Sequence, residues 1–213
     1  MAEPIHILEP IRRKWWRPTR IALAALGILG CLIGGCYAWR KHEYPYGWSH
    51  VCDKQLFMAL QDYAETHGGW FPAGESSPEA SLSLLYKGNR FVPECAYLLA
   101  GKRLAEKGVQ TVLNRGERLG PDTCGWNYVE GLRSDDDDRL ALFWDKEGLN
   151  HNGGRLSGGG HVVIFMHCRN EHINAKDWPD FLSRQEELWT ALRADGRQIR
   201  ISEAGRTPAG GKP

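Results

Sequence analysis

The sequence lacks most of the features that mark familiar functions. Its formal net charge at pH 7 is only +1, so it offers no basic surface of the kind that nucleic acid requires. It contains no CxxC pair and no HExxH motif, which argues against a thioredoxin-like centre, a zinc ribbon or a zincin protease. The glycine-rich stretch 152–160 lacks the GK[ST] ending of a phosphate-binding loop, and Ser157 does not fit the G-x-S-x-G elbow. We therefore expect a protein that is not an enzyme and does not bind nucleic acid.

Charge is also missing from residues 21–39, IALAALGILGCLIGGCYAW. As a helix this stretch would rise about 28 Å, close to the ~30 Å hydrocarbon core of a bilayer. The run Ile21 to Trp39 is therefore predicted to be a transmembrane helix in contact with lipid.

The residues around this run predict its orientation. Basic residues precede it at five positions, Arg12, Arg13, Lys14, Arg17 and Arg20. The positive-inside rule then places residues 1–20 in the cytoplasm and the rest of the chain in the periplasm, beyond a bacterial inner membrane. Aromatic residues at both ends (Trp15, Trp16, Tyr37 and Trp39) are typical of the two headgroup layers.

Two other interpretations of the run stay open. A cleaved signal peptide would have a shorter apolar core. Leu32 to Cys36 resembles a lipobox, in which Cys36 would carry a lipid anchor in place of a spanning helix.

The rest of the chain is divided by composition. Residues 40–50 form a linker with Pro45 and Gly47, which should end the helix. Residues 51–195 form the exported domain, and the Gly- and Pro-rich tail 196–213 is predicted to be disordered. Four cysteines of this exported part allow three pairings, and we expect one structural disulfide among Cys52, Cys95, Cys124 and Cys168.

Helical patterns dominate the first half of the domain. Residues 51–67 show an amphipathic period that ends at Gly68 and Gly69. A capping box at Ser76–Glu79 starts a second helix that ends at Gly88, and residues 93–100 form a short third one.

The second half changes to strands. Residues 126–129 and 140–144 form a predicted hairpin around the turn 134–138. The apolar stretch 161–168 is typical of a strand covered on both faces. It is followed by a strand at 171–174 and a last helix that Asp177 caps. The order predicts an α+β fold, with the helix 51–67 packed on a small antiparallel sheet and a C-terminal helix.

Two segments resemble a known family. Lys54-Gln55-Leu56, followed by Tyr63, His67-Gly68 and Phe71-Pro72, is similar to the start of pseudopilin-like ectodomains of planctomycete-type bacteria. These belong to type II secretion and type IV pilus systems. A second signature, H-x-G-G followed by N-V-x-F-x-D-G, is matched at His151, Gly153, Gly154, Val163 and Phe165. The resemblance implies pilin-like subunits or secretion components as partners.

The chain also departs from that family. The apolar run has no glutamate, which pilin precursors carry at the fifth mature position. Pro45 and Gly47 interrupt what should be one long helix, and His167-Cys168 stand where the family has Asp-Gly. The sequence therefore predicts a membrane tether with a pilin-like head and not a filament-forming stalk.

Metal sites have weak support. The run Asp135, Asp136, Asp137 and Asp138 could bind calcium through carboxylate oxygens, but the EF-hand pattern is absent and a solvated turn is the favoured interpretation. Four histidines, at positions 151, 161, 167 and 172, could contribute to a zinc site only if three or more converged. On a continuous strand, His161 and His167 would share a face opposite Cys168.

These observations lead to three functional hypotheses. The first is a non-enzymatic, single-pass envelope protein that acts through protein–protein interaction. The alternative is an exported ligand-binding module for a glycan or peptide. A metal-dependent hydrolase built on the histidines is the third.

Overall fold

Helix α1 (Trp16–Glu43) stands at the start of the computed structural model, which describes residues 16–49, 51–88 and 95–202. Contacts divide the chain into two units, residues 1–43 and 44–213, and we call the second the C-terminal domain. As predicted, α1 ends just before Pro45. Gly47 adopts φ +89°, and its N–H donates to the Tyr44 carbonyl at 3.1 Å, which closes a turn. Residues 1–15, including Trp15 and three of the five basic positions, lie outside the described residues.

The C-terminal domain is built on one antiparallel sheet, in the order β4-β3-β2-β1-β5. The strands are β1 (Trp126–Glu130), β2 (Ala141–Asp145), β3 (His161–Phe165), β4 (Asn170–Ile173) and β5 (Arg200–Ile201). Every residue of β1 and β2 is buried, because these strands lie inside the sheet with helices over both faces. The predicted β1–β2 hairpin is confirmed.

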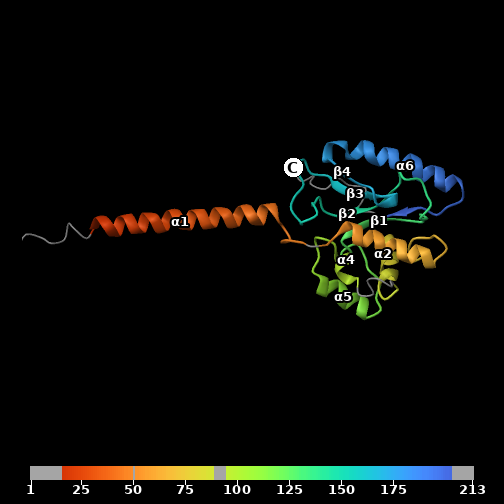
Figure 1. Cartoon of the computed structure of the whole chain (residues 1–213), viewed down its shortest axis with the longest axis horizontal. Helices are drawn as coiled ribbons and strands as arrows, with labels where there is room; N and C mark the ends of the chain where they lie inside the picture. The colour runs from red at the N-terminus through yellow and green to blue at the C-terminus, as the bar shows by residue number, and fades with distance from the viewer. Residues whose placement is uncertain (1–15, 50, 89–94, 203–213) are drawn as a thin grey trace, which may run out of the picture. The chain divides into compact units, whose positions relative to one another are not determined.

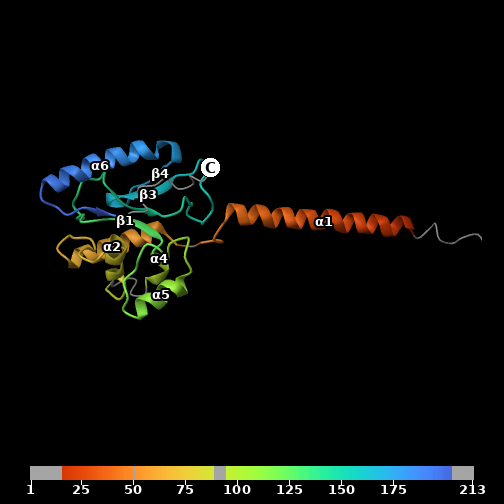
Figure 2. The same cartoon turned by 180° about the vertical axis from the view of Figure 1, so that it is seen from behind.

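Helices cover the two faces of this sheet. In Figures 1 and 2, α6 (Trp178–Ala194) lies on one side, and α2 (Asp53–Thr66), α4 (Ala96–Ala100) and α5 (Glu106–Asn114) lie on the other. Successive side chains of β2 point to opposite faces of the sheet, so that this strand contacts the helices on both sides. Trp144 packs edge-on against Trp178 of α6, with ring centroids 5.8 Å apart, while Phe143 packs against Trp126 at 5.2 Å. The predicted α+β class and the C-terminal helix are confirmed.

The helix ends have the capping residues that the sequence predicts, except that one N-cap lies one position later. α2 ends as predicted, with Gly68 and Gly69 at positive φ and the Gly69 N–H donating to the Ala64 carbonyl at 2.9 Å. α3 (Pro78–Leu82), continued by a 3₁₀ turn η2 (Ser83–Leu85), is capped by Ser77 and not by Ser76. The Ser77 Oγ accepts from the Ala80 N–H at 3.1 Å. Glu79 therefore does not close a capping box, and its carboxylate pairs with Lys146 at 3.0 Å.

Two predicted extents are wrong. The strand expected at 161–168 ends at Phe165, and residues 166–168 form a tight turn (η3) in which His167 and Cys168 have φ +55° and +62°. The tail expected to be disordered from 196 is ordered through Ser202, because Val129 pairs with Ile201 and Glu130 with Arg200. Residues 203–213 lie outside the described residues, as does the start of the predicted helix 93–100.

The sequence pattern also missed α5 and the short 3₁₀ turn η4 (Ala175–Asp177). The expected disulfide is wrong in this structure, since all six cysteines are free thiols. Cys95 and Cys124 are fully buried in the core, and burial raises their pKa values to about 12 and about 11. Neither thiol is therefore poised as a nucleophile.

Candidate functional site

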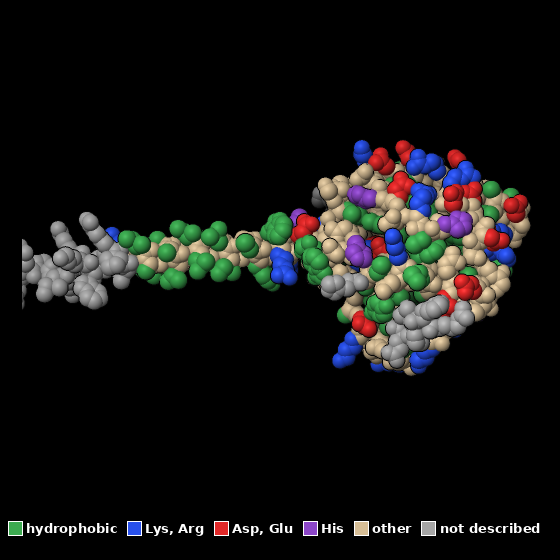
Figure 3. Space-filling view, viewed as in Figure 1, with side chains coloured by type: hydrophobic (Ala, Val, Ile, Leu, Met, Phe, Trp, Pro, Cys, Tyr) green, Lys and Arg blue, Asp and Glu red, His purple; other side chains and the backbone are tan. Residues whose placement is uncertain are grey.

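The apolar helix is the first candidate functional feature. Within the segment Arg20–Glu43, an 18-residue apolar window has a mean hydropathy of 2.1, and none of that window is buried. Figure 3 shows hydrophobic side chains along the face of this helix that is in view, and its large apolar residues, such as Ile21 and Leu29, are 70% and 52% exposed. By length and composition the segment can cross a membrane, although a signal sequence passes the same test. Tyr37 and Trp39, predicted for the headgroup layer, are 68% and 66% exposed.

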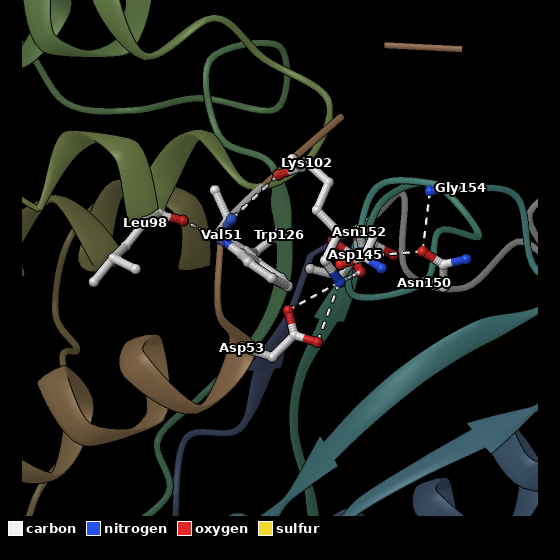
Figure 4. Close-up of polar contacts among 11 residues, drawn as sticks. Val51, Asp53, Leu98, Lys102, Trp126, Asp145, Asn150, Asn152 and Gly154 are labelled. Carbon is white, nitrogen blue, oxygen red and sulfur yellow. Dashed lines mark hydrogen bonds and ion pairs between the residues drawn. The ribbon is translucent and has the colours of Figure 1, made fainter. Parts of the chain in front are cut away.

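The second feature is a buried ion cluster in the C-terminal domain, drawn in Figure 4. Lys102 Nζ lies 2.6 Å from Asp145 Oδ2 and 2.9 Å from Asp53 Oδ1. The lysine side chain is 0% exposed, and its ammonium also lies 5.5 Å from the centre of the Trp126 ring. The cluster therefore joins the start of α2, the loop after α4 and the end of β2.

The charges of this cluster do not cancel. Two carboxylates face one ammonium, so full ionisation would leave a buried net negative charge. Burial raises the pKa of Asp145 to about 7, and the Asp53 carboxylate adds to the effect against the lowering by Lys102. Burial by itself lowers the pKa of Lys102, but the two carboxylates outweigh it and the pKa is raised. A lysine that stays protonated cannot serve as a nucleophile or base, so the cluster fits a structural role.

A pocket of about 420 Å³ lies beside this cluster, over the residues that follow α1. Its lining includes Tyr46, Trp48, Tyr97, Lys102 and Glu106. Tyr46 and Trp48 are 48% and 53% exposed, so aromatic surface is available to a bound molecule. Aromatic faces with a few polar groups suit glycan or peptide binding.

The glycine-rich loop holds the chain segment that borders this pocket. Asn150 Oδ1 accepts hydrogen bonds from the backbone N–H groups of Asn152 at 2.9 Å and Gly154 at 3.0 Å (Figure 4). The Asn152 carbonyl in turn accepts from the Ser49 N–H at 3.0 Å. Gly153 has φ +83°, and a Cβ there would lie 2.9 Å from the Gly47 carbonyl oxygen. The glycines of this loop therefore allow its backbone to pack closely against the segment that borders the pocket.

The four predicted calcium residues, Asp135 to Asp138, lie in the β1–β2 turn, and the first three of them pair with arginines of the same chain. Asp135 pairs with Arg133 at 3.0 Å, Asp137 with Arg139 at 2.6 Å and Asp136 with Arg197 at 2.6 Å. Hydrogen bonding by Arg133 lowers the pKa of Asp135, and hydrogen bonding by Arg139 lowers that of Asp137.

The histidines predicted as possible ligands are separated. His161 is buried against Trp178, with ring centroids 4.4 Å apart, whereas His151, His167 and His172 are exposed. The expectation that His161 and His167 share a strand face is wrong, because the strand ends between them. Among the residues that the structure describes, no group of three His, Cys, Asp or Glu side chains could hold a metal.

Sequence reasoning missed the Asp53–Lys102–Asp145 cluster. Lys102 lies 49 and 43 positions from its partners, and no local pattern connects residues so far apart. The weak signal was a lysine next to Gly101 at the end of a predicted helix. Comparison with known proteins adds no assignment, since no family model, no curated protein and no solved structure matches the chain.

Proposed function

We propose that the protein is a single-pass membrane protein whose C-terminal domain acts outside the cytoplasm through protein–protein interaction, without catalysis. The observation that carries this proposal is the uncharged run Ile21–Trp39 of α1, whose apolar side chains are exposed and whose apolar window has no buried residue. A helix of a soluble domain buries its apolar stripe against a core. A helix with no such stripe is suited to lipid contact on all sides.

A pseudopilin-like role in a secretion or cell-surface apparatus is the specific form of this proposal. Its support is the pair of sequence matches, which fall on α2 and on the region from His151 to Phe165. The arrangement of α2 against an antiparallel sheet agrees with the ectodomain that this resemblance implies. The basic residues before α1 support a cytoplasmic N-terminus and a periplasmic domain at a bacterial inner membrane.

Membrane fractionation tests the anchor. The full chain, expressed in a Gram-negative host with a C-terminal alkaline phosphatase, should resist carbonate extraction and show phosphatase activity. The double variant Leu29→Arg/Leu32→Arg should leave the membrane fraction, because each central arginine costs about 3 kcal/mol on the insertion scale. Met58→Arg is the matched control, since Met58 is an equally exposed apolar residue, 62% against 61% for Leu32, within the C-terminal domain.

Release of the unmodified chain by carbonate would overturn the spanning helix. A mature N-terminus at Trp39 or beyond would identify a cleaved signal peptide, and an acylated Cys36 at the mature N-terminus, detected by mass spectrometry, would identify a lipid anchor. Cross-linking in native membranes tests the interaction. Recovery of the monomer alone, with no envelope protein attached, would overturn the proposed protein–protein interaction.

The aromatic pocket favours one second candidate, an exported module that binds a glycan or peptide. Titration with soluble cell-wall glycan fragments or extended peptides should then change tryptophan fluorescence, and Trp48→Ala should abolish the response. Trp70→Ala is the control, because Trp70 is 41% exposed but does not line that pocket. An equal response in both variants would exclude the pocket as the site.

A further inference from the structure

Among the residues that the structure describes, no strand pairs with the outer edge of β4. This strand is the end strand of the order β4-β3-β2-β1-β5, and its residues Asn170, Glu171 and His172 are exposed. The Phe165 N–H donates to the Arg169 carbonyl at 2.8 Å, so residues 169, 171 and 173 direct their backbone groups toward β3. By alternation, the backbone N–H and C=O of Asn170 and His172 point away from the sheet. These groups can hydrogen-bond another strand.

Charged side chains beside this edge select one kind of partner strand. Arg169 and Glu171 lie next to Asn170 on either side and form an exposed ion pair at 2.8 Å. If a second copy pairs antiparallel with Asn170 opposite Asn170, each Arg169 faces the other copy's Glu171. Opposite charges directly across a strand pair are stabilising. A two-fold axis at Glu171 would instead place two carboxylates opposite each other, so the charges favour the axis at Asn170.

The groove beside β4 supports the same arrangement. A cavity of about 310 Å³ lies between β4 and α6, with Phe165, Ile173, Phe181 and Leu188 among its lining residues. Arg184 and Glu187 also line it, and neither has an ion-pair partner within the described part of the chain. A two-fold axis perpendicular to the sheet keeps both α6 helices on the same face of the joined sheet. The grooves then open toward each other, and Arg184 of one copy can face Glu187 of the other.

We propose that the β4 edge is a docking surface for a second copy of this chain, which pairs about Asn170 to form a continuous two-copy sheet. This inference rests on the proposed interaction function and names its partner. The membrane anchor favours it, because two copies held in one bilayer meet at a high effective concentration. β5, at the other edge, has only two residues and offers a shorter template.

Charge reversal tests the register. The full chain in mild detergent should sediment as a dimer, and Arg169→Glu or Glu171→Arg should each weaken dimerisation about 30-fold, because two attractive pairs become repulsive. An equimolar mixture of the two single variants should dimerise again, since every carboxylate at these two positions then faces a guanidinium of the other variant. The double variant Arg169→Glu/Glu171→Arg should recover as well. Arg193→Glu, which breaks the exposed pair with Glu186 on α6, is the control and should leave the dimer intact.

The mixing experiment separates a docking effect from misfolding, because only folded chains can restore each other. A wild-type chain that stays monomeric in detergent and in reconstituted bilayers would overturn the proposal. So would a dimer that both reversals leave unchanged, or single variants that do not recover on mixing. If the chain is monomeric but still cross-links to another envelope protein, only this inference fails. If it is dimeric but carbonate releases it, only the membrane proposal fails.

Discussion

The buried ion cluster yields the sharpest prediction, through the substitution Lys102→Met. Methionine keeps much of the side-chain volume but leaves Asp53 and Asp145 without their shared cation. Removing one partner of a buried ion pair costs about 3–5 kcal/mol. Because Lys102 is fully buried and serves two carboxylates, we expect a loss of free energy of unfolding at the upper end of that range at pH 8.

Asp145→Asn is the matched control and should behave differently. It removes the excess negative charge and leaves a neutral Asp53–Lys102 pair, while the asparagine Oδ1 can still accept a hydrogen bond from Lys102. We therefore expect a cost of about 1 kcal/mol or less. The difference between the two variants tests whether the second carboxylate leaves the buried cluster with an unbalanced negative charge.

The same cluster predicts a pH dependence. The pKa of Asp145 is about 7 in the folded chain and about 4 in an unfolded one. Between about pH 4 and pH 7 the folded state binds more protons than the unfolded state. The contribution of Asp145 to the free energy of unfolding therefore falls as the pH rises through this range, by up to ~1.4 kcal/mol per pH unit. Above about pH 7 this contribution stays constant, because Asp145 is ionised in both states. Asp145→Asn should remove this slope.

Urea unfolding of the full chain in mild detergent measures all three effects. Tryptophan fluorescence is a suitable signal, since four tryptophans are buried in the C-terminal domain, Trp126, Trp144, Trp178 and Trp189. A loss below about 1 kcal/mol for Lys102→Met would refute the reasoning, because breaking a buried ion pair costs several times more. An Asp145→Asn variant as unstable as Lys102→Met, or one that keeps the wild-type pH slope, would refute it as well.

Three further substitutions, the last with a matched control, test the fold by the same unfolding measurement. Cys168→Gly should stabilise the domain by about 1 kcal/mol, because φ +62° strains any residue with a Cβ; an unchanged midpoint would argue against that turn. Gln185→Leu should cost about 1–3 kcal/mol, because the buried Gln185 amide accepts from the Ala141 N–H and donates to the Arg139 carbonyl, both at 2.8 Å. Gly125→Ala should destabilise strongly, since its Cβ would overlap the Ala100 carbonyl, whereas Gly120→Ala has open space and should be tolerated.

Local patterns predicted most of the regular elements. The apolar run, the 3.6-residue period of α2 and the alternating hairpin β1–β2 each depend on residues a few positions apart, so the sequence displays them directly. The predicted strand 161–168 is too long because His167 and Cys168 carry no turn signal, although both adopt the positive φ that usually requires glycine or asparagine. α5 was missed because Gly108 and three β-branched residues, Val109, Thr111 and Val112, weaken its helical pattern.

The sequence alone determined that this chain has an uncharged helix long enough to span a membrane, followed by an α+β domain, because hydrophobic length and period act locally. Only the tertiary structure decided the rest. Residues 200–201 form a strand because β1 offers them a partner, although the tail composition favours disorder. Lys102 sits between two carboxylates because α2, the loop after α4 and β2 converge there. Burial then gives those charges pKa values and energies that no exposed residue of the same type would have.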